Sequence, residues 1–180
     1  MSINTVRLGP GNVLPSKDGE DVLTPGYTAD LELRIPATIR GPKRTENAKG
    51  RIWVTDHRVI FIADTLDTPG TSSSAANAPS EPPSYDAPPV LSSLEIPYAS
   101  LKIATYNLPT FSANNVLITF VPVPGDTSLP DPGRGQTIEA KVVVGEGAGH
   151  GVWKRIEGER MRAEERRKEE DVLPAYEPRI

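Results

Sequence analysis

The chain has 180 residues, a formal net charge of -4, 37% hydrophobic residues and only 6% aromatic ones. This length suits one domain with additional segments, and the low aromatic content predicts a small core. The acidic balance opposes direct nucleic-acid binding, because phosphates are attracted to basic surfaces. The absence of cysteine excludes disulfides, thiolate metal sites and a cysteine nucleophile. It also favours an intracellular location, in the nucleus, the cytoplasm or both.

The N-terminal third combines turn signals with three apolar runs. Residues 1–30 are rich in glycine and proline turns and are expected to be irregular. Residues 31–35 alternate strictly between apolar and polar side chains, which predicts a half-buried strand. A polar loop is expected over 40–50. The β-branched runs 51–55 and 58–62 follow, and the two residues between them have the spacing of a hairpin turn.

The second half of the chain repeats this strand pattern and ends in a helix. Four further strands are predicted, at residues 94–96, 101–106, 116–121 and 137–144. A helix is expected from about 152 to 171, with Val152, Trp153, Ile156 and Met161 on the face that docks on the sheets. Seven short strands followed by one helix predict a mainly β fold: a small sandwich or partly open barrel closed by the helix.

Residues 64–92 contain Ser, Thr, Ala and Pro but almost no large apolar side chains. This composition predicts a disordered insertion between two strands. Within it, Pro82-Pro83-Ser84-Tyr85 matches Pro-Pro-x-Tyr, the ligand of group I WW domains. Adjacent prolines favour a polyproline II helix, which enters an aromatic-lined groove at little further entropic cost. A chance match in a proline-rich linker is the alternative.

A second, weaker candidate lies near the C-terminus. Leu173, Pro174 and Tyr176 fit the Leu-Pro-x-Tyr variant of the same ligand. The alternative interpretation is that Pro174 simply ends the preceding helix, because proline cannot continue the backbone hydrogen bonds.

Several spaced blocks resemble the WW domain-binding protein 2 family, whose members contain a GRAM domain. Residues 49–61, Lys-Gly-Arg-Ile-Trp-Val-Thr-Asp-His-Arg-Val-Ile-Phe, are similar to the GRAM hairpin. The blocks 30–33, 94–98 and 108–114 resemble the first strand of the family, a later strand with its proline, and the Gln-Pro-Val-Phe-Gly-Ala-Asn loop. Relatives carry their Pro-Pro-x-Tyr motifs in a long tail, whereas this chain carries its motif in the insertion.

The resemblance implies a pleckstrin-homology-like fold, with seven strands and a C-terminal helix, over residues 20–160. Residues 1–19 form an irregular N-terminal segment in this scheme, and 161–180 form a charged helix end and tail. It also implies a non-catalytic adaptor that binds WW-domain proteins, either as a nuclear transcription coactivator acting with chromatin-associated factors or as a membrane-associated recruiter of a WW-containing HECT ubiquitin ligase.

A cluster of cations is the candidate contact for anionic lipid. Pleckstrin-homology folds can hold phosphoinositide headgroups in the loop between their first two strands, and clustered cations favour such a ligand. The residues concerned are Arg40, Lys43, Arg44, Lys49 and Arg51. An ordinary solvated hairpin loop is the alternative.

No other pattern in the sequence predicts chemistry. The glycine-rich run 145–151 lacks the spacing of a dinucleotide-binding loop and the Lys-Ser/Thr of a P-loop, so a flexible turn is expected. His57 and His150 are too few and too isolated for a metal cluster. We therefore expect no enzyme activity, no cofactor and no metal.

Overall fold

The computed structural model describes residues 2–9, 13–17, 19–38, 41–64, 91–122, 129–130, 132–133 and 135–170. Within these ranges the chain forms eight strands and one helix. In chain order they are β1 (Ser2–Ile3), β2 (Tyr27–Ile35), β3 (Arg44–Val54), β4 (Arg58–Ala63), β5 (Ser93–Pro97), β6 (Leu101–Asn107), β7 (Asn115–Phe120), β8 (Ile138–Val144) and α1 (Gly149–Glu170).

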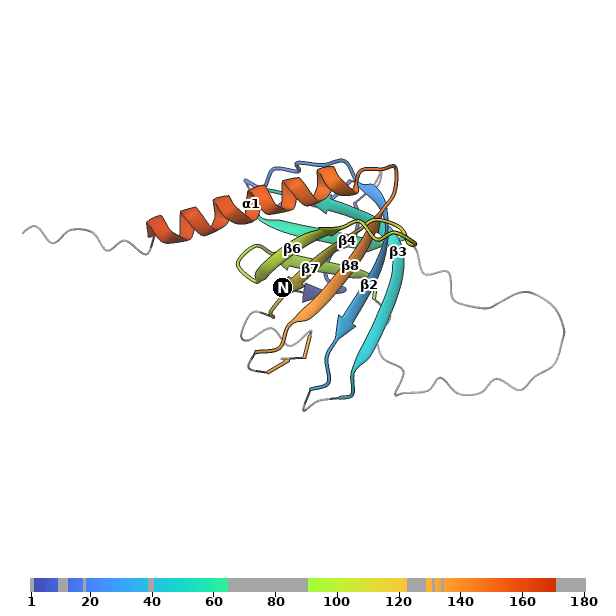
Figure 1. Cartoon of the computed structure of the whole chain (residues 1–180). Coiled ribbons are helices and arrows are strands. Elements are labelled where there is room, and N and C mark those ends of the chain that lie inside the picture. Colours follow the sequence, from blue (N-terminus) through green and yellow to red (C-terminus); the bar gives the residue numbers. More distant parts are fainter. Residues whose placement is uncertain are drawn as a thin grey trace, which may run out of the picture.

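The strands build one antiparallel sheet in the order β1-β5-β4-β3-β2-β8-β7-β6. Figure 1 shows that this sheet is strongly curled and that α1 crosses one end of it, with its C-terminal half projecting beyond the sheet. All seven predicted strands and the helix are therefore confirmed. The short strand β1, which pairs with β5, is an addition that the sequence did not predict.

The polar loop predicted over 40–50 is wrong from Arg44 onward. β3 begins at Arg44, which pairs with Ile35, and the ladder with β2 continues without interruption to Ile52 opposite Tyr27. Pairing with β2 satisfies the backbone of these polar residues, so the strand needs no apolar side chains at its start. Hydrophobic periodicity does not detect a strand of this kind.

The main core lies inside the curl of the sheet. β2 and β8 alternate between buried and partly exposed residues, as strands with one solvated face do. Leu33 and Phe120 are fully buried here, and Val152 and Ile156 of α1 close the core from one end. The predicted docking face of the helix is confirmed for these two residues. Met161, by contrast, is 55% exposed, because it lies on the opposite face of α1 from Ile156 and Ala163, which pack against the core.

Both faces of β4 are buried, as they are in the neighbouring strand β5. Val59 and Phe61 point into the main core, whereas Ile60 packs in a second cluster on the outer face. The N-terminal segment, described at 2–9, 13–17 and 19–24, supplies Val6 and Leu14 to this second cluster. This two-sided burial explains why the β4 sequence is continuously apolar rather than alternating.

Gly50 allows β3 to pair with both β2 and β4. β3 pairs with β2 along most of its length but with β4 only from Gly50 to Val54. A Cβ atom at Gly50 would collide with the carbonyl oxygen of Ile62 on β4. The missing side chain therefore lets the two backbones approach closely at the point where β4 leaves β3.

Side chains of α1 cover the free edge of β6. The Trp153 indole N–H donates to the carbonyl of Ala104 at 3.0 Å, and the backbone N–H of Ala104 donates to Glu157 Oε1 at 2.9 Å. Both backbone groups of an edge residue are thus satisfied by the helix. Trp153 therefore has a structural role, as expected from the sequence.

Candidate functional site

The segment that carries the Pro-Pro-x-Tyr motif joins β4 to β5. Pro82, Pro83 and Tyr85 themselves lie outside the described residues. The two ends of the segment are adjacent, because Ala63 N donates to the carbonyl of Ser92 at 2.9 Å and Asp64 N donates to the carbonyl of Lys49 at 2.9 Å. The motif is therefore inserted between two neighbouring, paired strands.

The insertion is shorter than the predicted range of 64–92. Leu91 is only 2% exposed and belongs to the main core. Ser92 donates from its backbone N and its hydroxyl to Asn4 Oδ1, at 2.6 and 2.8 Å. The buried side chain of Leu91 and the hydrogen bonds from Ser92 to Asn4 therefore fix the position of the chain where it enters β5. The second WW-ligand candidate, Leu173, Pro174 and Tyr176, lies outside the described residues, after the end of α1 at Glu170.

The hairpin that carries the strongest GRAM resemblance is closed by a threonine. Thr55 N donates to the carbonyl of Arg58 at 3.0 Å, which confirms the predicted two-residue turn. The Thr55 hydroxyl oxygen accepts the backbone N–H groups of His57 and Arg58, at 3.3 and 3.0 Å. This side-chain support replaces the glycine that such turns usually need.

A buried charge network begins at the same hairpin. The guanidinium of Arg58 contacts both carboxylate oxygens of Glu20 at 2.6 Å, and its Nη1 atom lies 3.0 Å from Glu95 Oε1. Burial alone would raise the pKa of Glu20. Hydrogen bonds from Arg58, the backbone N–H of Lys17 and the Thr55 hydroxyl outweigh that effect and lower the pKa to about 2. The network fixes the N-terminal segment on the outer face of β4 and β5.

The predicted lipid-contact cations do not form one group. Arg40 lies outside the described residues, and Lys43 is exposed just before β3. Arg44 alternates onto the inner side of β3, where its Nε atom lies 3.1 Å from Glu46 Oε1 as an ion pair without hydrogen-bond geometry. Burial raises the pKa of Glu46, and the charge of Arg44 opposes that shift.

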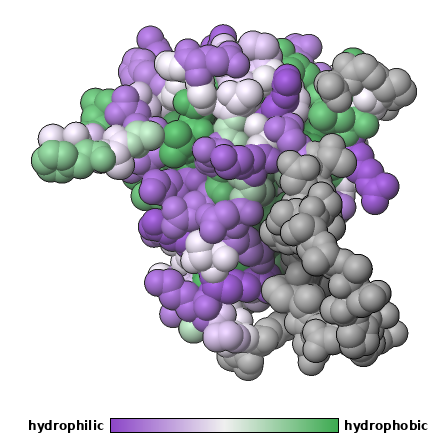
Figure 2. Space-filling model, turned by 90° about the vertical axis from the view of Figure 1, so that its right-hand side faces the viewer, coloured by the Kyte–Doolittle hydropathy of each residue, from purple (hydrophilic) through white to green (hydrophobic). Residues whose placement is uncertain are grey.

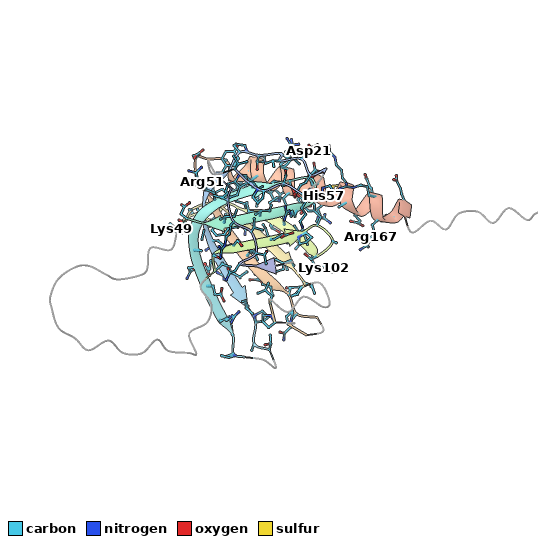
Figure 3. All side chains as sticks on the ribbon, turned by 180° about the vertical axis from the view of Figure 1, so that it is seen from behind. Asp21, Lys49, Arg51, His57, Lys102 and Arg167 are labelled. Carbon is cyan, nitrogen blue, oxygen red and sulfur yellow. The ribbon has the colours of Figure 1, made fainter. Side chains whose placement is uncertain are left out.

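Lys49 and Arg51 are the two cations that share the outer face of β3 (Figure 3). Neither forms an ion pair with another residue that the structure describes. A shallow hollow of about 440 Å³ lies beside them, with Asp30, Glu32 and Lys141 in its lining. Figure 2 shows that this side of the molecule is mainly hydrophilic. The lining of the hollow has no net formal charge, because Asp30 and Glu32 balance Lys49 and Lys141.

The described residues offer no arrangement that would bind a metal or span a membrane. Within those ranges, no three His, Asp or Glu side chains gather as metal ligands would. His57 instead pairs with Asp56, with 2.7 Å between Nδ1 and Oδ1, whereas His150 contacts the rings of Tyr106 and Trp153. In the same part of the chain, no helix combines the length and apolar character that crossing a bilayer requires.

One solved structure, described as the Vps36 N-terminal PH domain, superposes on 89% of this chain and 93% of its own with a TM-score of 0.54. The chain has a pleckstrin-homology-like fold. The sequence identity is 14%, so the likeness concerns the fold alone. No family model and no curated protein sequence matches the chain. The curled antiparallel sheet with its C-terminal helix confirms the predicted fold class.

Sequence reasoning missed the residues that fix the N-terminal segment. Glu20 and Lys17 lie among turn signals, and no local pattern marks either as a partner of β4 or β5. Arg58, at the start of an apolar run, was the one indication in the sequence of such a partner. A cation at the first position of a fully buried strand needs a buried counter-charge.

Proposed function

We propose that the chain is a non-catalytic adaptor: a pleckstrin-homology-like domain of the GRAM type that binds WW-domain proteins through Pro82, Pro83 and Tyr85. The adjacency of Ala63 and Ser92 is the observation that supports this role most directly. Because the ends of the insertion are held by paired strands, a ligand between them can be displayed without disturbing the core. The hairpin at residues 49–61 and its threonine-closed turn support the GRAM assignment.

Two cellular roles fit this adaptor. In one, it is a nuclear coactivator that links a WW-domain protein to chromatin-associated factors. In the other, it brings a WW-containing HECT ubiquitin ligase to a membrane or a cargo protein. A tagged chain enriched in the nucleus supports the first role, whereas endosomal puncta support the second.

Calorimetry of the intact chain against a panel of group I WW domains tests the proposal. Tyr85→Ala should weaken binding by tens of fold, because truncating a buried aromatic anchor at an interface commonly costs about 2 kcal/mol or more. Ser84→Ala is the matched control, since the third position of the motif accepts any residue. Absence of binding by the intact chain to every WW domain in the panel would refute the adaptor function.

Membrane association is the second candidate, and the shared face of Lys49 and Arg51 is the observation that favours it. Each cation near an anionic surface contributes about 1 kcal/mol at most, so we expect weak and salt-sensitive binding. Co-sedimentation with phosphoinositide vesicles measures it, with Lys49→Gln and Arg51→Gln as variants. Equal sedimentation of the variant and the wild type would remove these residues from the site.

A further inference from the structure

The C-terminal half of α1 overhangs the turns that join β3 to β4 and β5 to β6. A groove of about 530 Å³ lies beneath this overhang. Its lining comes from three separate parts of the chain: residues 56–57, 97–102 and 160–167. Figure 3 labels His57, Lys102 and Arg167 on this side of the molecule, far from Lys49 and Arg51. The groove is therefore distinct from the outer face of β3.

The groove combines an apolar floor with a cationic rim. Tyr98 and Leu101, which are 5% and 6% exposed, lie at its base. The exposed side chains of Lys102 and Arg167 lie at its edge. A ligand in this groove would meet apolar surface below and positive charge at the sides.

The charges at the rim are only partly compensated. Asp56 pairs with His57, and Glu164 lies 3.6 Å from Arg160 and 2.9 Å from Lys168. Neither Lys102 nor Arg167 has a carboxylate within ion-pair distance among the residues that the structure describes. The Arg166 guanidinium donates to a backbone carbonyl, that of Asp56, at 3.2 Å and so also keeps its full charge. The groove therefore has a net positive character on a chain whose net charge is -4.

We propose that this groove binds a short acidic peptide segment of a partner protein, with one or two apolar side chains on the floor and flanking carboxylates on Lys102 and Arg167. A guanidinium suits this task because its planar fork pairs with a carboxylate through two hydrogen bonds. The site is independent of the proposed WW-binding function, which uses another part of the chain.

The shape of the groove favours a peptide over a lipid bilayer. A flat membrane surface would reach the projecting helix before it reached the floor beneath. It would also meet Glu165 and Glu169, which line the neighbouring surface of α1, and anionic headgroups would be repelled there. A single extended chain can enter the recess without contacting those carboxylates.

Solution NMR of the full chain provides the test. The probe is a synthetic nine-residue peptide with Leu-Phe at its centre and Asp and Glu on both sides. A second peptide, with Asn and Gln in place of the acids, measures the contribution of charge. We expect the acidic peptide to shift the amide signals of residues 97–102 and 160–167 and the neutral peptide to bind much more weakly.

Two pairs of charge-reversing substitutions distinguish binding in the groove from attraction by the net charge of the protein. Lys102→Glu with Arg167→Glu should weaken binding of the acidic peptide by about fivefold or more, since each exposed ion pair is replaced by repulsion. Lys154→Glu with Arg155→Glu changes the net charge equally on the same helix but outside the groove, and should leave affinity within about twofold. If the first pair of substitutions disturbs folding, Lys102→Gln with Arg167→Gln tests the same rim with less repulsion.

Three results would overturn the proposal. One is equal weakening by both pairs of charge reversals, which would show attraction by net charge alone. Another is a set of shifted amides that excludes the groove. The third is binding of phosphatidylserine vesicles through Lys102 and Arg167 without binding of the acidic peptide, which would identify a lipid surface as the ligand.

Discussion

Arg58 on β4 and Glu20 in the N-terminal segment form a bidentate buried ion pair, with both nitrogen–oxygen distances at 2.6 Å. Their side chains are only 5% and 1% exposed. The pair joins residues that are far apart in the sequence. It holds the N-terminal segment in place, and Val6 and Leu14 of that segment pack with Ile60 and Ile62 on the outer face of β4. The N-terminal segment is thus part of the folded unit.

Replacing Glu20 with Gln should destabilise the protein by about 3 kcal/mol, because it leaves a buried guanidinium with one counter-charge fewer. Urea denaturation followed by circular dichroism measures the change. Lys17→Gln is the control: Lys17 pairs with Glu95, but its side chain is 66% exposed, so its loss should cost less than about 1 kcal/mol. Equal effects of the two substitutions would contradict a special role for the buried pair.

Acid should remove the contribution of Glu20 in a defined range. The folded protein lowers the pKa of Glu20 from 4.5 to about 2. Stability from a lowered carboxylate pKa is fully present above the unfolded value and is lost as the pH falls toward the folded one. The difference in unfolding free energy between wild type and Glu20→Gln should therefore shrink by roughly 3 kcal/mol between pH 4.5 and pH 2. A constant difference across that range would show that Glu20 does not titrate this way.

The insertion between β4 and β5 should be dispensable for folding. We expect replacement of 65–90 by a short Gly-Ser linker to change stability by about 1 kcal/mol or less, since halving a flexible loop alters its closure entropy by only about 0.6 kcal/mol. Thermal unfolding measures this, and WW binding should disappear in the same protein. In contrast, Leu91→Ala should cost about 2–5 kcal/mol, because Leu91 lies in the core. Loss of cooperative unfolding in the linker protein would show that the insertion packs.

The contribution of the contact between α1 and the edge of β6 to stability can be measured by replacing Trp153. Trp153→Phe removes the donor to the carbonyl of Ala104 and should cost about 1–3 kcal/mol. Hydrogen exchange of the β6 amides should accelerate more than that of β2, which β8 and β7 separate from β6 in the sheet. Uniform acceleration across the sheet would instead indicate general destabilisation.

Phosphorylation of Tyr85 should abolish WW binding, because it places a charge of about -1.5 to -2 in a largely apolar pocket. Pro83→Ala should also weaken binding, through lost groove contact and lost pre-organisation. Tyr176→Ala should matter less, since Leu173 stands where the first proline of the stronger motif would be. Calorimetry with synthetic phosphorylated and unmodified peptides compares these cases. Stronger loss from Tyr176→Ala than from Tyr85→Ala would reverse the assignment of the main ligand.

The sequence alone determined seven of the eight described strands, the helix and the fold class, because alternation and β-branched runs directly reflect burial on one face of a sheet. It also located the Pro-Pro-x-Tyr motif, which is a property of local sequence. It missed the first half of β3, where polar residues from Arg44 onward form a strand only because β2 pairs with them.

Only the tertiary structure determined which residues that are distant in the sequence contact one another. The pairing of Glu20 with Arg58 depends on how the N-terminal segment folds back over β4, and no periodic pattern records such a long-range contact. The predicted cation cluster does not form, because successive side chains of β3 lie on opposite faces of the sheet. Arg44 lies on the inner face, whereas Lys49 and Arg51 lie on the outer face. The groove beneath α1 likewise exists only where the helix, the hairpin turn after β3 and the start of β6 meet in space.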